Sequence, residues 1–125
     1  MKKHVRNWAI PAIPMLLLAF SGSMKLVSSQ EVIEQMTGKF GFPPSTIIPI
    51  GWLELTCMLL YAIPKTSVLG AILVTAYLGG ATATHVRASD ASYFMPPIIG
   101  VLVWLGLYLR DERIRALVPL LSSKR

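Results

Sequence analysis

An acidic side chain stands inside a long apolar run. Glu54 lies in IGWLELTCMLLYAIP, residues 50–64, where its neighbours are mainly Leu, Ile, Met, Tyr and Trp. An ionised carboxylate is costly in hydrocarbon, so a membrane span that carries Glu54 must pair it, protonate it or turn it toward a watered cavity. Each outcome places the side chain inside a bundle. On a helix, Gly51, Cys57 and Tyr61 share its face.

Two basic side chains could meet this carboxylate. His85 lies near the end of the apolar stretch that contains GGATATHVR, residues 79–87, and Lys25 ends another stretch. A carboxylate, an imidazole and an ammonium in a pocket of low dielectric could transfer protons or hold the polar group of a lipophilic ligand. Glu54, His85 and Lys25 are therefore the candidate catalytic residues.

The candidate ligand-binding residues are neighbours of these three in the expected helices, namely Thr82, Thr84, Tyr61, Trp52 and Arg87. Structural roles compete with the functional ones. Lys25 and Arg87 could extend to the membrane interface, as basic residues at span ends commonly do. His85 could cap its helix, and Glu54 could tie helices together without any chemistry.

Four apolar segments must position these residues, at about 8–25, 46–63, 67–85 and 93–109. A bilayer span needs about 20 apolar residues, and 54% of the chain is hydrophobic whereas 14% is charged. We therefore expect an all-α, integral membrane four-helix bundle that forms a single membrane domain over residues 1–125. We attribute the net charge of +6 to the basic residues that orient a protein in the membrane. Nucleic acid is not expected as a partner, because no basic stripe alternates with aromatics.

Basic residues set the expected orientation. The side with both termini and the 64–66 turn carries Lys2, Lys3, Arg6, Lys65, Arg110, Arg113, Arg115, Lys124 and Arg125, and the other side carries Lys25, Lys39 and Arg87. This bias predicts a multi-pass protein with both termini in the cytoplasm and a cytoplasmic tail at 110–125. MKKHVR and AFSGS also resemble a signal peptide. We expect the segment to be retained, because Pro11, Pro14 and the polar SGSMK end suit a packed helix.

Residues 26–44 contain the pattern of a short amphipathic helix at about 29–37. Ser28 and Glu31 have capping-box spacing, and Gly38 suits a C-terminal cap. The helix is either a connector that shields apolar surface or a lid over a site. Small residues four apart in 79–84, Gly79 with Ala83 and Gly80 with Thr84, predict a close approach to a neighbouring helix.

Several kinds of chemistry lack their usual residues. Cys57 is the single cysteine, so the chain offers no dithiol. One histidine and one carboxylate in the spans fall short of a three-ligand metal site, and no phosphate-binding glycine loop or nucleophile elbow is present. We expect no intrinsic cofactor and no metal.

Several motifs together resemble the DoxX-like family of small bacterial integral membrane proteins. They are SGSMKL at 21–26, GFPP at 41–44, IGWLEL at 50–55, LGAILVTAYLGGATATHVR at 69–87 and LRDERIRAL at 109–117. The resemblance implies a four-helix fold in the bacterial inner (plasma) membrane. The family takes its name from a subunit of a thiosulfate:quinone oxidoreductase, and other members are associated with membrane redox complexes or with quinone-like compounds. Membrane sterol isomerases, which have similar bundles, use acidic residues in a membrane pocket.

Three functional hypotheses follow. The leading one is an intramembrane polar pocket for a small lipophilic molecule such as a quinone, in a subunit that serves a redox partner. The second is a stand-alone enzyme in which Glu54 and His85 perform acid/base chemistry, such as isomerisation, cyclisation or epoxide opening. The third is a carrier or assembly factor without catalysis. Membrane lipid and the lipophilic molecule are the expected partners, and a redox subunit and a homo-oligomer stay open.

Overall fold

Four long helices form the molecule in the computed structural model, which describes residues 2–121 and the side chains from Trp8 onward. They are α1 (Lys2–Val27), α3 (Ile47–Ala62), α4 (Ser67–Arg87) and α5 (Met95–Arg110). Together with short flanking turns, each is long and apolar enough to cross a membrane. The predicted all-α fold with four spans is thereby confirmed, and the chain is a multi-pass membrane protein.

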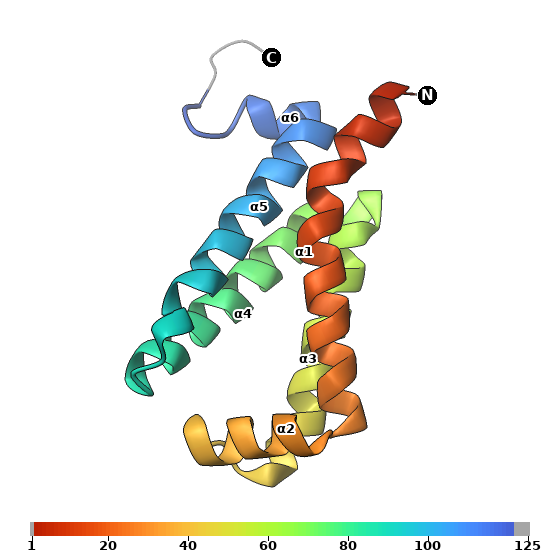
Figure 1. Ribbon diagram of the computed structural model, residues 1–125. Helices are drawn as coiled ribbons and strands as arrows, with labels where there is room; N and C mark the ends of the chain where they lie inside the picture. Colours follow the sequence, from red (N-terminus) through yellow and green to blue (C-terminus); the bar gives the residue numbers. More distant parts are fainter. Residues whose placement is uncertain (1, 122–125) are drawn as a thin grey trace.

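The helices pack in a ring in which α1 contacts α3, α3 contacts α4, α4 contacts α5 and α5 returns to α1. Short 3₁₀ turns join neighbours, with η3 (Pro64–Thr66) between α3 and α4 and η4 (Ala91–Phe94) between α4 and α5. After α5 the chain forms one turn, α6 (Glu112–Arg115). Both described ends of the chain lie at the same end of the bundle (Figure 1).

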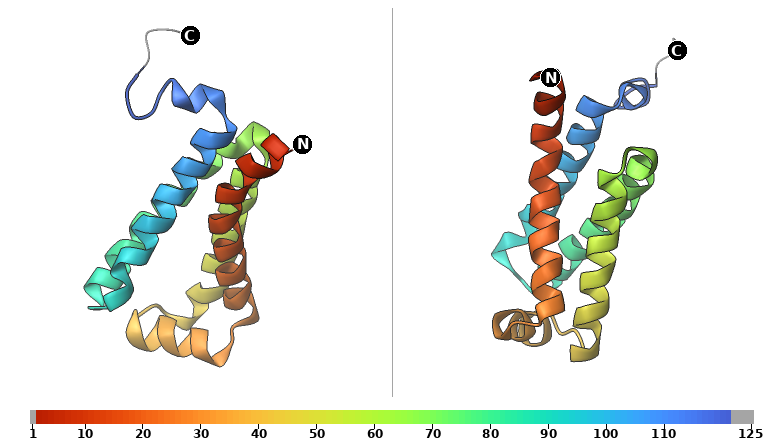
Figure 2. Two further views of the ribbon diagram at one scale, coloured as in Figure 1. Left: turned by 45° about the horizontal axis from the view of Figure 1, so that its top comes forward. Right: turned by 90° about the vertical axis from the view of Figure 1, so that its right-hand side faces the viewer.

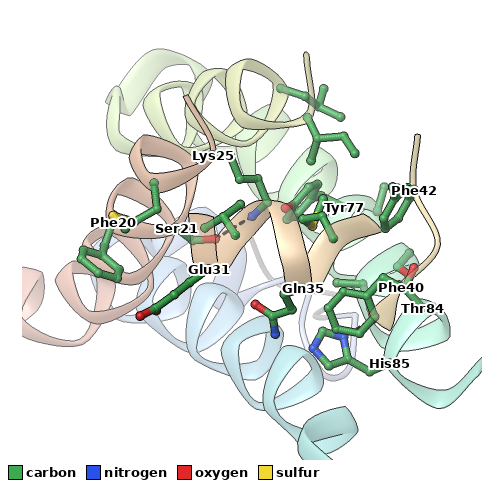
Figure 3. A pocket seen from close by; sticks show the side chains of 18 residues that line it. Phe20, Ser21, Lys25, Glu31, Gln35, Phe40, Phe42, Tyr77, Thr84 and His85 are labelled. Carbon is green, nitrogen blue, oxygen red and sulfur yellow. Dashed lines mark hydrogen bonds between the residues drawn. The ribbon is translucent and has the colours of Figure 1, made fainter. Parts of the chain in front are cut away.

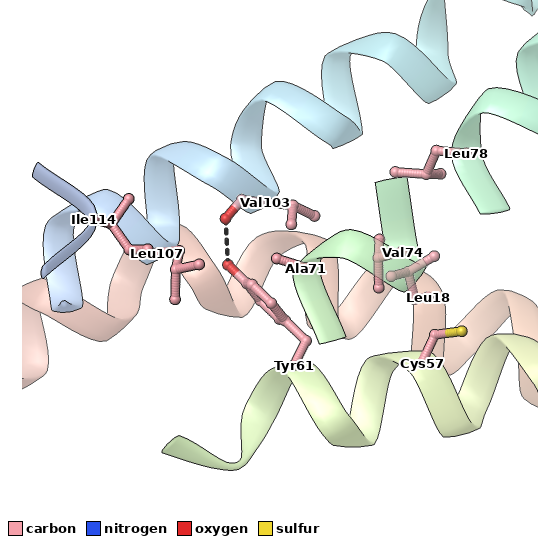
Figure 4. Packing of buried hydrophobic residues seen from close by; sticks show 9 residues of the cluster. All are labelled: Leu18, Cys57, Tyr61, Ala71, Val74, Leu78, Val103, Leu107 and Ile114. Atoms are coloured by element: carbon pink, nitrogen blue, oxygen red, sulfur yellow. Dashed lines mark hydrogen bonds between the residues drawn. The ribbon is translucent and has the colours of Figure 1, made fainter. Parts of the chain in front are cut away.

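A buried cluster holds the helices together near the termini. Tyr61 is its centre, fully buried, and its hydroxyl donates a 2.7 Å hydrogen bond to the Val103 carbonyl (Figure 4). A Cβ on Gly106 would lie 2.8 Å from the Tyr61 hydroxyl and 2.9 Å from Pro11 Cα. The absence of a side chain at Gly106 therefore allows α1, α3 and α5 to meet. The cluster comprises Leu18, Cys57, Tyr61, Ala71, Val74, Leu78, Val103, Leu107 and Ile114.

From this cluster the pair α1–α3 and the pair α4–α5 diverge, so that the bundle opens away from the termini (Figures 1 and 2). The sequence predicted that Gly79 and Gly80 pack closely against a neighbouring helix, and within this chain the prediction was wrong. A Cβ on either glycine would meet nothing within 4 Å. Gly80 borders the space where the two pairs have separated, whereas Gly79 borders a groove between α4 and α5.

The connection between α1 and α3 crosses the open end (Figure 2). It contains α2 (Gln30–Ile33), which continues as the π-helical turn η1 (Glu34–Lys39), and then η2 (Pro44–Thr46). We call residues 29–40 the lid segment. The predicted short helix between the first two spans is confirmed, although it runs to Lys39.

The caps of the lid segment differ from those predicted. Ser29, rather than Ser28, caps the helix, and its hydroxyl accepts from the Val32 N–H at 3.4 Å. Ser28 is left-handed, with φ 55°, and ends α1. Gly38 lies inside η1, whereas Gly41, with φ 76°, provides the left-handed turn. The lid segment is thus bounded by two left-handed residues, Ser28 and Gly41.

Candidate functional site

The buried carboxylate of Glu54 meets two donors from two different helices. Lys25 Nζ of α1 lies 2.9 Å from Glu54 Oε1, and the Tyr77 hydroxyl of α4 donates to the same oxygen at 2.8 Å. Glu54 is 2% exposed and the Lys25 side chain 12%. A buried charge is tolerated when it is paired and hydrogen-bonded, and this network satisfies that condition while linking α1, α3 and α4.

Close helix packing brings Lys25 to Glu54. A Cβ on Gly51 would lie 3.0 Å from both the Gly22 carbonyl oxygen and Lys25 Cβ, and a Cβ on Gly22 would lie 2.8 Å from the Leu55 side chain. Both glycines are buried. Each precedes its charged residue by three positions, which is one helical turn, so the contact between the two glycines brings the ammonium against the carboxylate.

A cavity of about 680 Å³ lies next to this network, between the diverging helices and the lid segment. Its wall includes Lys25 and Tyr77, whereas Glu54 lies behind them and does not line it. Figure 3 shows labelled side chains from α1, the lid segment and α4 around the cavity. The other polar lining residues are Ser21, Glu31, Gln35, Thr84 and His85, and the apolar ones include Phe20, Met24, Val32, Met36, Phe40, Phe42, Ile50 and Leu53.

Lys25 faces this cavity with donor capacity to spare. Its ammonium donates to Ser21 Oγ at 2.8 Å and to Glu54 Oε1 at 2.9 Å. An ammonium carries three N–H donors. The third is available to an acceptor oxygen in the cavity.

His85 occupies another part of the same wall. Its Nδ1 lies 2.6 Å from the Ala81 carbonyl oxygen, so this nitrogen is the donor, and its ring packs against Phe40 at 4.8 Å between centroids. Its Nε2 lies 3.7 Å from Asp90 Oδ2. His85 and Lys25 thus line one cavity, while the carboxylate nearest to the imidazole is Asp90.

Contacts between the lid segment and the end of α4 close one side of the cavity. Lys39 Nζ lies 3.4 Å from Asp90 Oδ2, and Arg87 donates to the Phe40 carbonyl at 2.7 Å. The pKa of Asp90 is lowered, first by the hydrogen bond from the Ser92 backbone N–H and then by Lys39 and His85. We call this set, with the Phe40–His85 ring contact, the latch.

Of the predicted ligand-binding residues, Thr84 lines the cavity and the other four lie elsewhere. Thr84 lines the cavity and donates to the Gly80 carbonyl at 2.8 Å, whereas Thr82 lines a different groove between α4 and α5. Tyr61 belongs to the buried cluster near the termini. Trp52 is 60% exposed on the outside of α3. Arg87 belongs to the latch.

Sequence reasoning missed Tyr77 and Asp90. Tyr77 lies two turns before His85 on the same helix, so the i, i+4, i+8 spacing from Tyr77 through Ala81 to His85 was a usable signal. Asp90 was treated as part of a polar turn. Its side chain is 8% exposed, which nothing in the turn sequence indicated.

Comparison with known proteins gives one match. The model of the DoxX-like family matches residues 9–106, a range that covers all four long helices except the beginning of α1 and the end of α5. No curated protein and no solved structure matches the chain.

Proposed function

The chain belongs to the DoxX-like family, and from this premise we propose that it binds a small lipophilic molecule of the quinone class in the cavity, as a subunit serving a membrane oxidoreductase. One observation carries the proposal. Lys25 lines a largely apolar cavity, and its ammonium is held by Ser21, beside it in the wall, and by Glu54, behind the wall. Such a fixed donor suits a carbonyl oxygen, and the apolar wall suits a ring and its tail.

In this proposal Glu54 is a positioning residue. It fixes Lys25 and Tyr77, which themselves face the ligand. His85 would contact the far end of a ligand that spans the cavity. A molecule with oxygen atoms at opposite ends of one ring, as in a quinone, would place one oxygen at the Lys25 ammonium and the other near His85, whose Nε2 can donate only when both ring nitrogens carry a proton.

The lid segment would control access. It supplies Val32, Gln35, Met36 and Phe40 to the cavity wall, and it is bounded by the left-handed residues Ser28 and Gly41. A ligand could enter when the latch opens and the segment swings about these ends.

Adjacent glycines on α4 provide the test. Gly80 lines the cavity, Gly79 lines the groove on another face of α4, and a Cβ at either meets nothing within 4 Å. Gly80→Leu should therefore extend its side chain into the cavity and obstruct it, and Gly79→Leu is its matched control. Native mass spectrometry in mild detergent, with a short-chain benzoquinone added, should show a complex with wild type and Gly79→Leu that Gly80→Leu loses.

A matched ligand tests the polar contact. An alkylbenzene of the same shape lacks the two oxygens and should bind at least about tenfold more weakly, the effect of about 1.4 kcal/mol. Lys25→Met should remove this preference. Equal binding of both molecules to wild type, or an intact complex in Gly80→Leu, would contradict the proposal.

A second candidate function, acid/base catalysis, is favoured because Lys25 and Tyr77 share one carboxylate oxygen of Glu54. Because Lys25 and the Tyr77 hydroxyl both bind Glu54 Oε1 and both line the cavity, they could transfer a proton to or from a bound molecule, as in an isomerase, cyclase or epoxide-opening enzyme. The purified protein would then turn over such a substrate alone, with Glu54→Gln abolishing the rate. The quinone-binding subunit would react only with its redox partner present.

We further propose that the protein lies in the bacterial inner membrane with both termini in the cytoplasm. The excess of basic residues on the side of the termini supports this orientation. Alkaline phosphatase, which is active only outside the cytoplasm, should be inactive when fused after Arg125 and active when inserted at 43–45. The reverse pattern would overturn the orientation.

A further inference from the structure

A groove of about 740 Å³ runs between α4 and α5, on a different face of α4 from the cavity. Its lining is almost wholly apolar. Val101 and Leu105, which border it, are 66% and 41% exposed. In a membrane-spanning helix pair, these side chains face lipid. The groove is thus a hollow in the lipid-facing surface rather than an extension of the ligand cavity.

The groove has the length of one leaflet. On α5 its lining extends from Pro96 to Tyr108, which corresponds to about 18 Å of helix at 1.5 Å per residue. Half of a hydrocarbon core about 30 Å thick is about 15 Å. An extended acyl chain therefore fits along the groove.

Two glycines leave the groove open. A Cβ on Gly79 of α4 would meet nothing within 4 Å, and a Cβ on Gly100 of α5 would meet only Leu78 Cδ1, at 3.8 Å. Both glycines line the groove. The absence of their side chains provides space that a chain of methylene groups could occupy.

The end of the groove nearest the termini carries a positive charge. Tyr108 lines this end, together with Val118 and Pro119 from the segment after α6, and the guanidinium of Arg115 lies 5.8 Å from the Tyr108 ring centroid. Arg115 is exposed and donates to the Leu109 carbonyl at 2.9 Å. A guanidinium has five N–H donors, so Arg115 retains capacity for a phosphate. Arg113 adds less, because it already pairs with Asp111.

We propose that this groove is a binding site for an anionic phospholipid, with one acyl chain over Gly79 and Gly100 and the phosphate at Arg115. The apolar lining and the length select an acyl chain. The arginine at the membrane boundary selects an acidic head group.

The full-length protein in mild detergent provides the test, with phosphatidylglycerol and phosphatidylcholine of identical acyl chains as the probes. Native mass spectrometry should show one retained phosphatidylglycerol per chain in wild type. Gly79→Leu should lose it, while Gly80→Leu, which obstructs the other cavity, should keep it. Arg115→Gln should reduce the preference for phosphatidylglycerol over phosphatidylcholine by about fivefold, the effect of one basic residue near an anionic surface.

Each other result overturns the proposal. Equal retention of the two lipids by wild type would show that Arg115 does not select the head group. Retention by Gly79→Leu at the level of wild type would place the lipid elsewhere. A dimer that Gly79→Leu dissociates, without any lipid retained by the wild-type protein, would show that a second copy of the chain occupies the groove.

Discussion

Gly22 and Gly51 face each other where α1 crosses α3, and a Cβ on Gly51 would lie 3.0 Å from the Gly22 carbonyl oxygen. This contact and the Lys25–Glu54 ion pair are one turn apart on both helices. The packing of two small residues and the pairing of two charges are therefore one structural unit, and the separation of the two helices should affect both.

Gly51→Ala should separate α1 from α3, because the added methyl group meets backbone and Lys25 Cβ rather than the end of a flexible side chain. We expect a loss of about 1–3 kcal/mol in the free energy of unfolding, as for overpacked interiors. Thermal unfolding in detergent measures it. Gly79→Ala, which adds the same group in open space, is the control, and equal stability of the two variants would contradict the expectation.

Glu54→Gln should destabilise the protein, because it leaves Lys25 as an unpaired, largely buried charge. Removing one partner of a buried pair typically costs about 3–5 kcal/mol. The double variant Glu54→Gln with Lys25→Met removes both charges and should recover part of the loss. A double variant that is no more stable than Glu54→Gln would show that the charge pairing is not the source of the effect.

Tyr77→Phe should separate binding from stability. It removes the hydrogen bond to Glu54 Oε1 and should cost about 1 kcal/mol in stability. Benzoquinone binding should weaken severalfold, because the carboxylate that holds Lys25 loses one of its two restraints. Titration with the quinone measures this change, and Tyr93→Phe, at an exposed position outside the cavity, is the control. Unchanged affinity in Tyr77→Phe would remove Tyr77 from the site.

The latch should weaken in acid. The pKa of Asp90 is lowered from its ordinary value of 3.8 in the folded protein. Because this pKa is lowered, the contribution of Asp90 to the stability of the folded protein is fully present above the ordinary pKa. It is lost as the pH falls through the lower pKa that Asp90 has in the folded protein. Hydrogen exchange of residues 29–40, corrected for intrinsic rates, should therefore rise below about pH 4.

Asp90→Asn separates the effect of Asp90 from other effects of acid on the lid segment. The variant should exchange faster than wild type at neutral pH, and the difference between the two proteins should diminish in acid. Identical exchange at every pH would show that Asp90 does not hold the lid segment.

The sequence predicted the part of the site that depends on charge. A carboxylate in a span must be satisfied inside the bundle, and the topology brings Lys25 to the same half, so their proximity could be anticipated. Tyr77 could not be found by that reasoning, since a tyrosine is compatible with lipid, interface or core. The cavity depends on the divergence of the two helix pairs and the groove on the packing of α4 against α5. A stripe of small residues such as Gly79 and Ala83 has the same pattern whether it borders a helix or an empty space.

The connection between α1 and α3 is longer than their packing requires. These two helices already lie side by side, and α3 and α4 show that one 3₁₀ turn is enough to join such neighbours. The lid segment is therefore an addition to the bundle, attached at its two ends, at the latch and through Met36 and Phe40, which form a buried cluster with Ile47 of α3. The contacts that close the ring of spans, α1 with α3, α3 with α4, α4 with α5 and α5 with α1, are made by the four long helices themselves. A protein built in this way is modular, with a ring of spans that closes on itself and one segment added across its open end.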